Sequence, residues 1–256
     1  MTLLPSLSNN TYKVSINNHS YLLKIPRADT KQFIDRYHEQ TNTQIAFNLG
    51  LAPKVLWQSE SGIYLIHYLE NIRHLNSKDL HNPHFISKLV THLSTLQKSS
   101  APFKGDLHNT ETIRNHLNQY YKLCTDNVQN KLKKTHVKAL LMLDKIEQYD
   151  SPAVPSHSDL TLGNILVEKN KEERVWLIDW EYSAMASPFW DIATLCNEGT
   201  FNDMQANDFL SKLINTPTQK EIELLTHYRF LLKGLSQCWQ GAFQINKPCS
   251  MSGLIN

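Results

Sequence analysis

A change in the spacing of apolar residues near residue 70 constrains the fold of this chain more than any other feature. Before that point, residues 12–16 and 20–25 alternate between apolar and polar side chains, which is typical of half-buried strands. The pair Asn17-Asn18 stands between them and favours a tight turn, because asparagine tolerates the left-handed backbone conformation. The pattern therefore predicts an antiparallel hairpin.

One helix and two further strands complete this first part of the chain. Asp29 or Thr30 can cap a helix that ends at Gly50, and residues 54–58 and 63–68 have the composition of strands. Strands arranged around a single helix predict a small lobe of the α+β class with an antiparallel sheet. We expect this lobe to comprise residues 1–70.

The remaining residues, 71–256, are predicted to form a mainly helical second lobe. Apolar residues recur at three- and four-residue spacing in residues 85–97, 112–124 and 128–149, and again between residues 191 and 243. Two short strands, at residues 165–167 and 175–178, interrupt the helices. The chain as a whole is therefore expected to be an α+β protein with two lobes.

The glycines exclude the two best-known nucleotide-binding fingerprints. They stand at positions 50, 62, 105, 163, 199, 234, 241 and 253. Neither G-x-G-x-x-G nor the P-loop G-x-x-x-x-G-K-[ST] can be formed with this spacing. A nucleotide would need a different phosphate site.

Charge and cysteine content exclude several other classes. The 26 Lys and Arg residues nearly balance the 24 Asp and Glu residues, so neither nucleic acid nor a membrane surface is an expected partner. The four cysteines are too far apart for a disulfide framework or a C-x-x-C zinc site, and the histidines do not form H-E-x-x-H. The sequence has no signal-like segment or long apolar run, and we expect a cytoplasmic protein.

The strongest chemical signal is the motif H-x-D-x-x-x-x-N, which runs from His157 through Asp159 to Asn164. A second aspartate, Asp179, follows the apolar residues Leu177-Ile178. Phosphoryl transfer needs a carboxylate that orients the attacking hydroxyl, and amide and carboxylate oxygens that hold Mg²⁺. These residues could also be ordinary turn residues, but their joint spacing and the neighbouring strands favour a phosphotransferase.

The same region resembles a known family. The motif at residues 157–164, the string I-D-W-E-Y at residues 178–182 and W-D-I-A at residues 190–193 are similar to the choline/ethanolamine kinase branch of the aminoglycoside phosphotransferase-like kinases. The resemblance implies a two-lobed protein-kinase-like fold and a kinase that uses ATP and Mg²⁺. It also implies roles for individual residues: Asp159 as catalytic base, Asn164 and Asp179 as Mg²⁺ ligands, His157 as a brace of the catalytic loop, and Asp191 as a hydrogen-bonding partner of that loop.

The first lobe carries the residues that the resemblance assigns to ATP. Lys24 on the second hairpin strand would pair with the phosphates and take part in catalysis, and Glu39 in the following helix would hold it. Ser8, Asn9 and Asn10 occupy the place of the phosphate loop, without its usual glycines. The hinge expected to bind adenine is residues 67–71, which include Tyr68 and Glu70.

The acceptor is expected to be a small cationic alcohol, most simply choline or ethanolamine. A quaternary ammonium is recognised by aromatic faces and a nearby carboxylate, and the second lobe offers Tyr182, Glu198, Trp239 and Trp180, with Trp190 and Glu181 as further candidates. An aromatic residue at helical or strand spacing is also a common core residue, so each of these assignments has a structural alternative.

Three other functions remain to be weighed. A thiamine or aminoglycoside kinase would share the fold, and a non-catalytic nucleotide-binding module would share its outline. A hydrolase using Ser156 or Ser158 with His157 and Asp159 is excluded, because neighbours on one extended segment cannot converge on one reacting atom. The preference between ATP and GTP and the oligomeric state stay open.

Overall fold

The computed structural model describes residues 1–4, 9–27, 34–149, 151–169 and 174–243. The N-terminal part is a five-stranded antiparallel sheet in the order β1-β2-β3-β5-β4. Its strands are β1 (Thr2–Leu4), β2 (Asn9–Ile16), β3 (His19–Pro26), β4 (Val55–Gln58) and β5 (Tyr64–His67). The predicted hairpin is confirmed: Asn17 and Asn18 have φ of 49° and 62°, as a two-residue turn between twisted strands requires.

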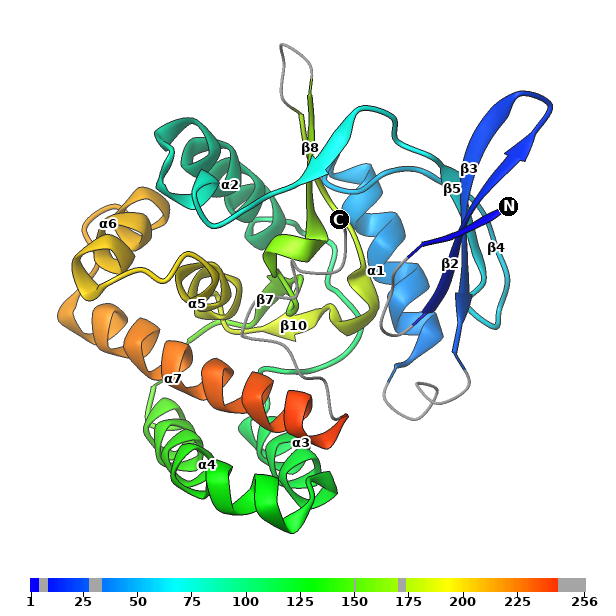
Figure 1. Cartoon of the computed structure of the whole chain (residues 1–256). Coiled ribbons are helices and arrows are strands. Elements are labelled where there is room, and N and C mark those ends of the chain that lie inside the picture. Colours follow the sequence, from blue (N-terminus) through cyan, green and yellow to red (C-terminus); the bar gives the residue numbers. More distant parts are fainter. Residues whose placement is uncertain (5–8, 28–33, 150, 170–173, 244–256) are drawn as a thin grey trace.

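One helix, α1 (Arg36–Asn48), lies between this sheet and the rest of the molecule (Figure 1). The predicted caps Asp29 and Thr30 fall outside the described residues, and the helix begins later than expected. Its N-cap is Asp35, whose side chain accepts hydrogen bonds from the backbone N–H groups of Tyr37 and His38, satisfying donors that the first turn leaves unpaired. The predicted C-terminal glycine is confirmed, since Gly50 has a φ of +75°.

The C-terminal part is mainly helical, as predicted. Its helices are α2 (Pro83–Gln97), α3 (Thr110–Leu123), α4 (Asp126–Ile146), α5 (Phe189–Glu198), α6 (Asp203–Leu213) and α7 (Gln219–Ala242). Helices α3, α4 and α7 pack side by side at one end of the molecule, and α5 lies over the middle of α7 (Figure 1). Their facing apolar side chains make one continuous core with the strands next to them.

Two small antiparallel sheets lie between the helices and the large sheet. One has the order β6-β8-β9 and the other pairs β10 with β7. The strands are β6 (Ile72–His74), β7 (Val154–Ser156), β8 (Ile165–Glu168), β9 (Val175–Leu177) and β10 (Ala184–Ala186). Strands β8 and β9 were predicted from their continuous apolar runs. Strands β6, β7 and β10 were missed because their three residues include no run of β-branched or aromatic side chains. The loops after β7 and β9 carry the predicted catalytic residues.

Helix α7 comes very close to helix α4. A Cβ atom on Gly234 would lie 2.6 Å from the Cβ atom of Ala139, which is closer than two carbon atoms can approach. The absence of a side chain at position 234 therefore sets how closely the two helices pack. None of the helices in the described residues is both long and apolar enough to cross a membrane.

Candidate active site

The loop that follows β7 is held in place by one buried carboxylate. Asp191, in the first turn of α5, accepts hydrogen bonds from the backbone N–H groups of His157 (2.8 Å) and Ser158 (2.9 Å). Ser158 has a φ of 63°, a conformation that costs energy for a residue with a side chain unless its surroundings hold it. The sequence-based prediction that Asp191 bonds back into this loop is confirmed.

His157 joins this loop to the next one. Its Nε2 atom donates a hydrogen bond to the carbonyl of Ile178 at 2.9 Å, and its ring lies against Trp180 with the ring centroids 4.5 Å apart. The side chain is fully buried, and burial lowers the pKa of the imidazole, with a smaller opposing effect from Asp191. Because His157 bonds to backbone next to Asp179, it can position that aspartate, as expected for a brace.

Asp159 and Asn164 are in direct contact. The Asn164 Nδ2 atom donates to both the backbone carbonyl and the Oδ2 atom of Asp159, each at 2.8 Å. These two bonds use the amide nitrogen, so the amide oxygen of Asn164 is the atom that can ligate a cation. Burial raises the pKa of Asp159, and the nearby Asp179 and Glu181 raise it further.

Asp179 stands at a sharp bend between β9 and the short 3₁₀ helix η4 (Trp180–Tyr182). Its backbone is left-handed, with φ 67° and ψ 63°, a conformation that aspartate adopts more readily than most residues. The bend brings its carboxylate to the Lys24 Nζ atom, with which it forms an ion pair and a hydrogen bond. Strand β3 and the loop after β9 therefore meet at this pair.

Lys24 is surrounded by three carboxylates. Besides Asp179, the Nζ atom lies 3.8 Å from Glu39 and 3.9 Å from Glu181. Burial alone would lower the pKa of this ammonium, but Asp179, Glu181 and Glu39 together raise it. Lys24 is therefore charged, and the predicted proximity of Lys24 and Glu39 is present in the structure.

Arg36 and Glu181 belong to the same cluster, and the sequence analysis did not assign them to it. The Arg36 Nη1 atom lies 2.6 Å from the Glu39 Oε2 atom and 3.5 Å from the Glu181 Oε2 atom. The spacing of Arg36 and Glu39, three residues apart on α1, was the one available signal. Glu181 had been considered only for the acceptor, since nothing in its position along the chain indicates that it faces Lys24.

The carboxylates of this cluster form a set of oxygen donors suited to a divalent cation. One carboxylate oxygen each from Glu39, Asp179 and Glu181 lie within 4.8 Å of one another, and the amide oxygen of Asn164 belongs to the adjacent loop. Hard oxygen ligands of this kind are those that Mg²⁺ prefers. Asp179 therefore belongs to a set of oxygen donors that suits a magnesium ion, with Glu39 and Glu181 as further carboxylates next to it.

The three residues expected at the phosphate loop have different positions. Asn9 is buried, and its Nδ2 atom donates to the Glu181 Oε2 atom at 3.1 Å. Asn10 is exposed and pairs with Ile25, so its side chain lies on the face of the sheet opposite to Lys24, which pairs with Thr11. The expected phosphate contact of the Asn10 side chain is therefore not supported by its position, and Ser8 lies outside the described residues.

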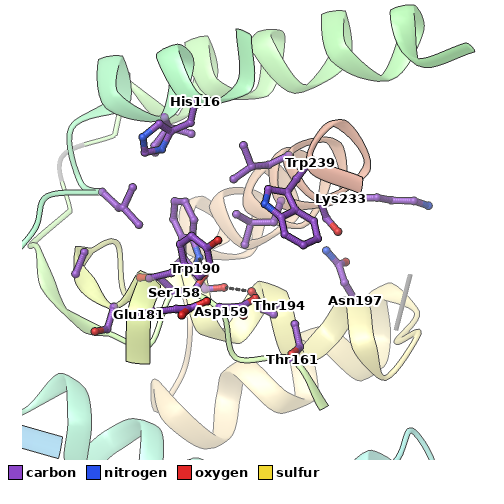
Figure 2. Close-up of a pocket in the computed structure, with 18 of the residues that line it drawn as sticks. His116, Ser158, Asp159, Thr161, Glu181, Trp190, Thr194, Asn197, Lys233 and Trp239 are labelled. Carbon is purple, nitrogen blue, oxygen red and sulfur yellow. Dashed lines mark hydrogen bonds between the residues drawn. The ribbon is translucent and has the colours of Figure 1, made fainter. Parts of the chain in front are cut away.

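A large cavity opens beside Asp159. Its volume is about 720 Å³, and its walls come from α3, α5, α7, η4 and the catalytic loop. In Figure 2, His116 and Trp239 lie across the cavity from Asp159 and Glu181. Five of the six acceptor candidates from the sequence line it: Glu181, Tyr182, Trp190, Glu198 and Trp239.

Other cavity residues were found only in the structure. Helix α3 contributes His116 and Tyr120, whose rings stack at a centroid distance of 6.1 Å. Trp190, by contrast, was already a candidate from the sequence, and its Nε1 atom donates to the carbonyl of Ser158 at 2.9 Å. No sequence motif marks the residues of α3, because their place in the cavity depends on how α3 packs against α7.

Trp180 is not an acceptor residue by position. Its side chain is 2% exposed, and its Nε1 atom donates to the carbonyl of Leu177 at 3.1 Å. The ring packs edge-on against Phe103 and at a tilt against His157. The alternative reading of this tryptophan, as a core residue, is the one that its surroundings support.

Glu198, at the end of α5, links the cavity to the catalytic loop. Its Oε2 atom accepts a hydrogen bond from the backbone N–H of Leu162 at 3.0 Å. Burial raises the pKa of Glu198, while the bond from Leu162 acts in the opposite direction. The carboxylate can therefore face the cavity and hold the loop at the same time.

Comparison with known proteins agrees with this geometry. The family model described as choline/ethanolamine kinase matches residues 1–233. Protein LicA of Haemophilus influenzae is 28% identical over 224 residues, which cover 84% of this chain and 79% of that protein. The other curated relatives are longer, so the chain spans between 44% and 62% of their lengths.

Solved structures show the same fold. The choline kinase LicA from Streptococcus pneumoniae superposes with a TM-score of 0.80 at 22% identity, covering 98% of this chain and 88% of that chain. A structure of LicA in complex with AMP has a TM-score of 0.76 at 23% identity and covers 95% and 83% of the two chains. The predicted kinase-like fold is thereby confirmed. The catalytic motif, the paired lysine and the family match together place this small-molecule kinase in the choline/ethanolamine kinase family.

Proposed function

We propose that this protein transfers the γ-phosphoryl group of ATP, with Mg²⁺, to the hydroxyl of a small cationic alcohol, choline or ethanolamine. The observation that carries the proposal is the position of Asp159. Asp159 lines the aromatic cavity, and it is close enough to Asp179 and Glu181, which both lie near the Lys24 Nζ atom, for these carboxylates to raise its pKa. A hydroxyl bound in the cavity next to Asp159 would thus face a phosphate held by Lys24.

The charge of the cavity supports a cationic acceptor. Carboxylates among its lining residues are Asp35, Asp106, Asp159, Glu181 and Glu198, whereas the cations are Arg229 and Lys233. Arg229 forms an ion pair at 3.1 Å with Asp203, a residue that does not line the cavity. The surplus of negative charge attracts an ammonium group and disfavours an anionic acceptor.

The proposed acceptor contacts follow from the same walls. The aromatic rings of Tyr182 and Trp239 would lie against the ammonium group, and Glu198 would supply the nearby carboxylate. Burial and Glu181 raise the pKa of Tyr182, so its hydroxyl stays protonated and neutral. A cation in this cavity therefore meets uncharged aromatic faces.

In the proposed mechanism, Asp159 accepts a hydrogen bond from the alcohol and aligns its oxygen with the phosphoryl group. Asn164 holds Asp159 in place, and Asp191 holds the loop that carries it. Lys24 would bind phosphate oxygens, kept in position by Glu39 and indirectly by Arg36. Bound Mg²⁺, ligated by Asn164 and Asp179, would offset charge on the phosphates. Positioning and electrostatics then lower the barrier.

The proposal also assigns the two parts of the chain. We propose residues 1–70 as the nucleotide-binding lobe and residues 71–256 as the catalytic and acceptor-binding lobe. The segment that contains Tyr68 and Glu70 would be the hinge that contacts adenine. The relative solved with bound AMP supports a nucleotide site in this fold.

A coupled ADP-release assay tests the acceptor directly. The screen contains choline, ethanolamine, thiamine and several aminoglycosides, each with Mg²⁺ and with excess chelator. We expect ADP release with choline or ethanolamine that depends on Mg²⁺, and none with tetramethylammonium, which has the cation but no hydroxyl. Release only with thiamine or an aminoglycoside would move the assignment to those kinases. ATP binding without transfer to any alcohol would favour a non-catalytic module.

A further inference from the structure

The face of the large sheet that carries Lys24 can be followed from the phosphate end to the hinge. Thr11 pairs with Lys24, and Lys13 pairs with Leu22. Leu22 in turn pairs with Ile66 on β5. Because paired residues share a face and alternate residues along a strand return to it, Lys13, Leu22 and Ile66 form a row beside Lys24.

This row lies on the hinge side of Lys24. Strand β5 runs from Tyr64, which pairs with Lys24, to Ile66 and then towards Tyr68. Two residues along a strand correspond to about 7 Å. Leu22 and Ile66 are only partly buried, although their face is turned towards the catalytic loop. The row of Lys13, Leu22 and Ile66 can therefore cover one face of a flat apolar ligand group.

Lys13 is the unusual member of this row, because it is charged. Its Nζ atom lies 3.9 Å from the centroid of the Tyr68 ring and 3.3 Å from the Glu70 Oε1 atom. Its methylene chain can still cover apolar surface, as a leucine would. Lys13 thus connects strand β2 with the segment proposed as the hinge.

The pair of Lys13 and Glu70 is poorly suited to a purely structural role. The side chains are 33% and 60% exposed, and exposed ion pairs add little to stability. Tyr68 is already fixed by the sheet, since its backbone N–H donates to the carbonyl of Ser20 at 3.1 Å. A cation held over an aromatic ring at the mouth of a nucleotide site has a more direct use in contacting the ligand.

We propose that Lys13 is a binding residue for the base end of a purine nucleotide. Its methylene chain, with Leu22 and Ile66, covers the base, and its ammonium group closes the outer edge of the site between Tyr68 and Glu70. This inference rests on the proposed nucleotide site but adds a residue that the catalytic motif does not include. Lys13 would contact the nucleoside and not the phosphates, because Lys24 is the residue proposed to bind the phosphates.

The test compares three ligands by isothermal titration calorimetry: ATP, AMP and inorganic tripolyphosphate. For Lys13→Met, which keeps the methylene chain and removes the charge, we expect ATP and AMP to bind about two- to fivefold more weakly, by the same factor. Tripolyphosphate binding should not change. In turnover, the KM for ATP should rise by the same factor, with kcat and the KM for the alcohol unaltered.

Two control variants separate this contact from general effects. Lys13→Arg keeps a cation that can lie over Tyr68 and pair with Glu70, and should bind AMP like the wild type. Lys212→Met removes an exposed lysine of α6 that is paired with Asp208 at 2.7 Å. This variant should bind ATP and AMP with the same affinity as the wild type. Thermal unfolding of the ligand-free variants should match that of the wild type.

The outcomes distinguish this inference from the function on which it rests. If wild-type protein binds AMP and Lys13→Met binds it equally well or more tightly, the role of Lys13 is wrong while the nucleotide site stands. The same conclusion follows if Lys13→Met weakens the binding of tripolyphosphate as much as the binding of AMP. If the wild type binds neither nucleotide, both the nucleotide site and the role of Lys13 are wrong.

Discussion

Asp159 acquires its surroundings both from its own loop and from more distant parts of the chain. Asn164 bonds to its carboxylate, Asp191 holds its loop, and His157 ties that loop to Ile178. The sequence predicted this set because the motif spacing is family-specific. It did not predict the contacts of Glu181 with Asn9 and Arg36, because side chains from three separate elements meet there and no local pattern records such a meeting.

Replacing Asp159 with Asn should abolish most turnover without disturbing nucleotide binding. The amide cannot take up the hydroxyl proton, so we expect kcat to fall by about 10²–10⁴-fold, the usual range for a general base. ATP affinity, measured by calorimetry, should stay at the wild-type value. Asp106→Asn is the control: this exposed carboxylate also lines the cavity, and asparagine can still accept the bonds from His108 and Asn109. Turnover of Asp159→Asn within tenfold of the wild type would remove Asp159 from the mechanism.

Trp239→Leu should weaken binding of the alcohol and leave binding of ATP unaffected. Loss of an aromatic face next to a desolvated cation predicts a rise of about tenfold in the KM for choline or ethanolamine. The KM for ATP should not change, because Trp239 lies across the cavity from Asp159 (Figure 2). Trp57→Leu serves as the control, since Trp57 is an exposed tryptophan on β4. An unaltered KM for the alcohol would contradict the assignment of Trp239.

At the scale of elements, length and composition decided which features were predictable. Helices α2, α3 and α4 and the hairpin have enough residues to show a period, and they were predicted within a few residues of their ends. Strands β1, β6, β7 and β10 have three residues each and no run of β-branched or aromatic side chains, so no local pattern marks them, whereas the equally short β9 is marked by Val175-Trp176-Leu177. The start of α1 was misplaced because several capping residues precede it, and Asp35 alone makes the cap within the described chain.

The contact between α4 and α7 predicts a destabilising glycine substitution. In Gly234→Ala, the new methyl group would overlap with Ala139, so the two helices would have to move apart. We expect the free energy of unfolding to fall by about 1–3 kcal/mol, although alanine favours a helix over glycine by about 1 kcal/mol. The measurement is chemical denaturation.

The partner position provides the control for this contact. Adding Ala139→Gly makes room for the new methyl group, so the double variant should be less destabilised than the sum of the two single variants. A Gly234→Ala protein as stable as the wild type would show that α4 and α7 do not approach each other as closely as described.

At the scale of the whole molecule, buried histidines predict a loss of stability in mild acid. Burial lowers the pKa of five histidines: His74, His116, His136, His157 and His227. The unfolded chain takes up protons on these groups below its ordinary value of about 6.5, whereas the folded protein resists doing so. The free energy of unfolding should therefore decrease as the pH falls from 7.5 to 5.5.

Urea unfolding at several pH values checks this expectation. The slope against pH should be smaller in His116→Gln, because this variant lacks one of the groups that take up a proton only on unfolding. The buried carboxyl groups of Asp159, Asp191 and Glu198 have raised pKa values, so they act in the opposite direction as the pH falls. The comparison of His116→Gln with the wild type isolates the histidine, and equal slopes for the two proteins would contradict the account of the histidines.

The sheet-rich N-terminal part and the helical C-terminal part were predictable from the change in apolar period, and the cavity beside Asp159 was not. The cavity forms where α3, α5 and α7 leave space between them, which depends on the packing of all three helices. His116 and Tyr120 consequently carry no signal in the sequence, and Trp180 was assigned to the acceptor although it packs in the core. Motifs indicate the chemistry of this protein, while the cavity proposed to bind its substrate is a property of the assembled fold.

The most direct test of the central claim is to observe the transferred phosphoryl group by ³¹P NMR. Wild-type protein is incubated with ATP, Mg²⁺ and either choline or ethanolamine, and Asp159→Asn is incubated in parallel. We predict that the wild type forms a phosphomonoester of one of these alcohols together with an equal amount of ADP, and that the variant forms almost none. Binding of ATP with no phosphomonoester, or release of inorganic phosphate in its place, would contradict the account.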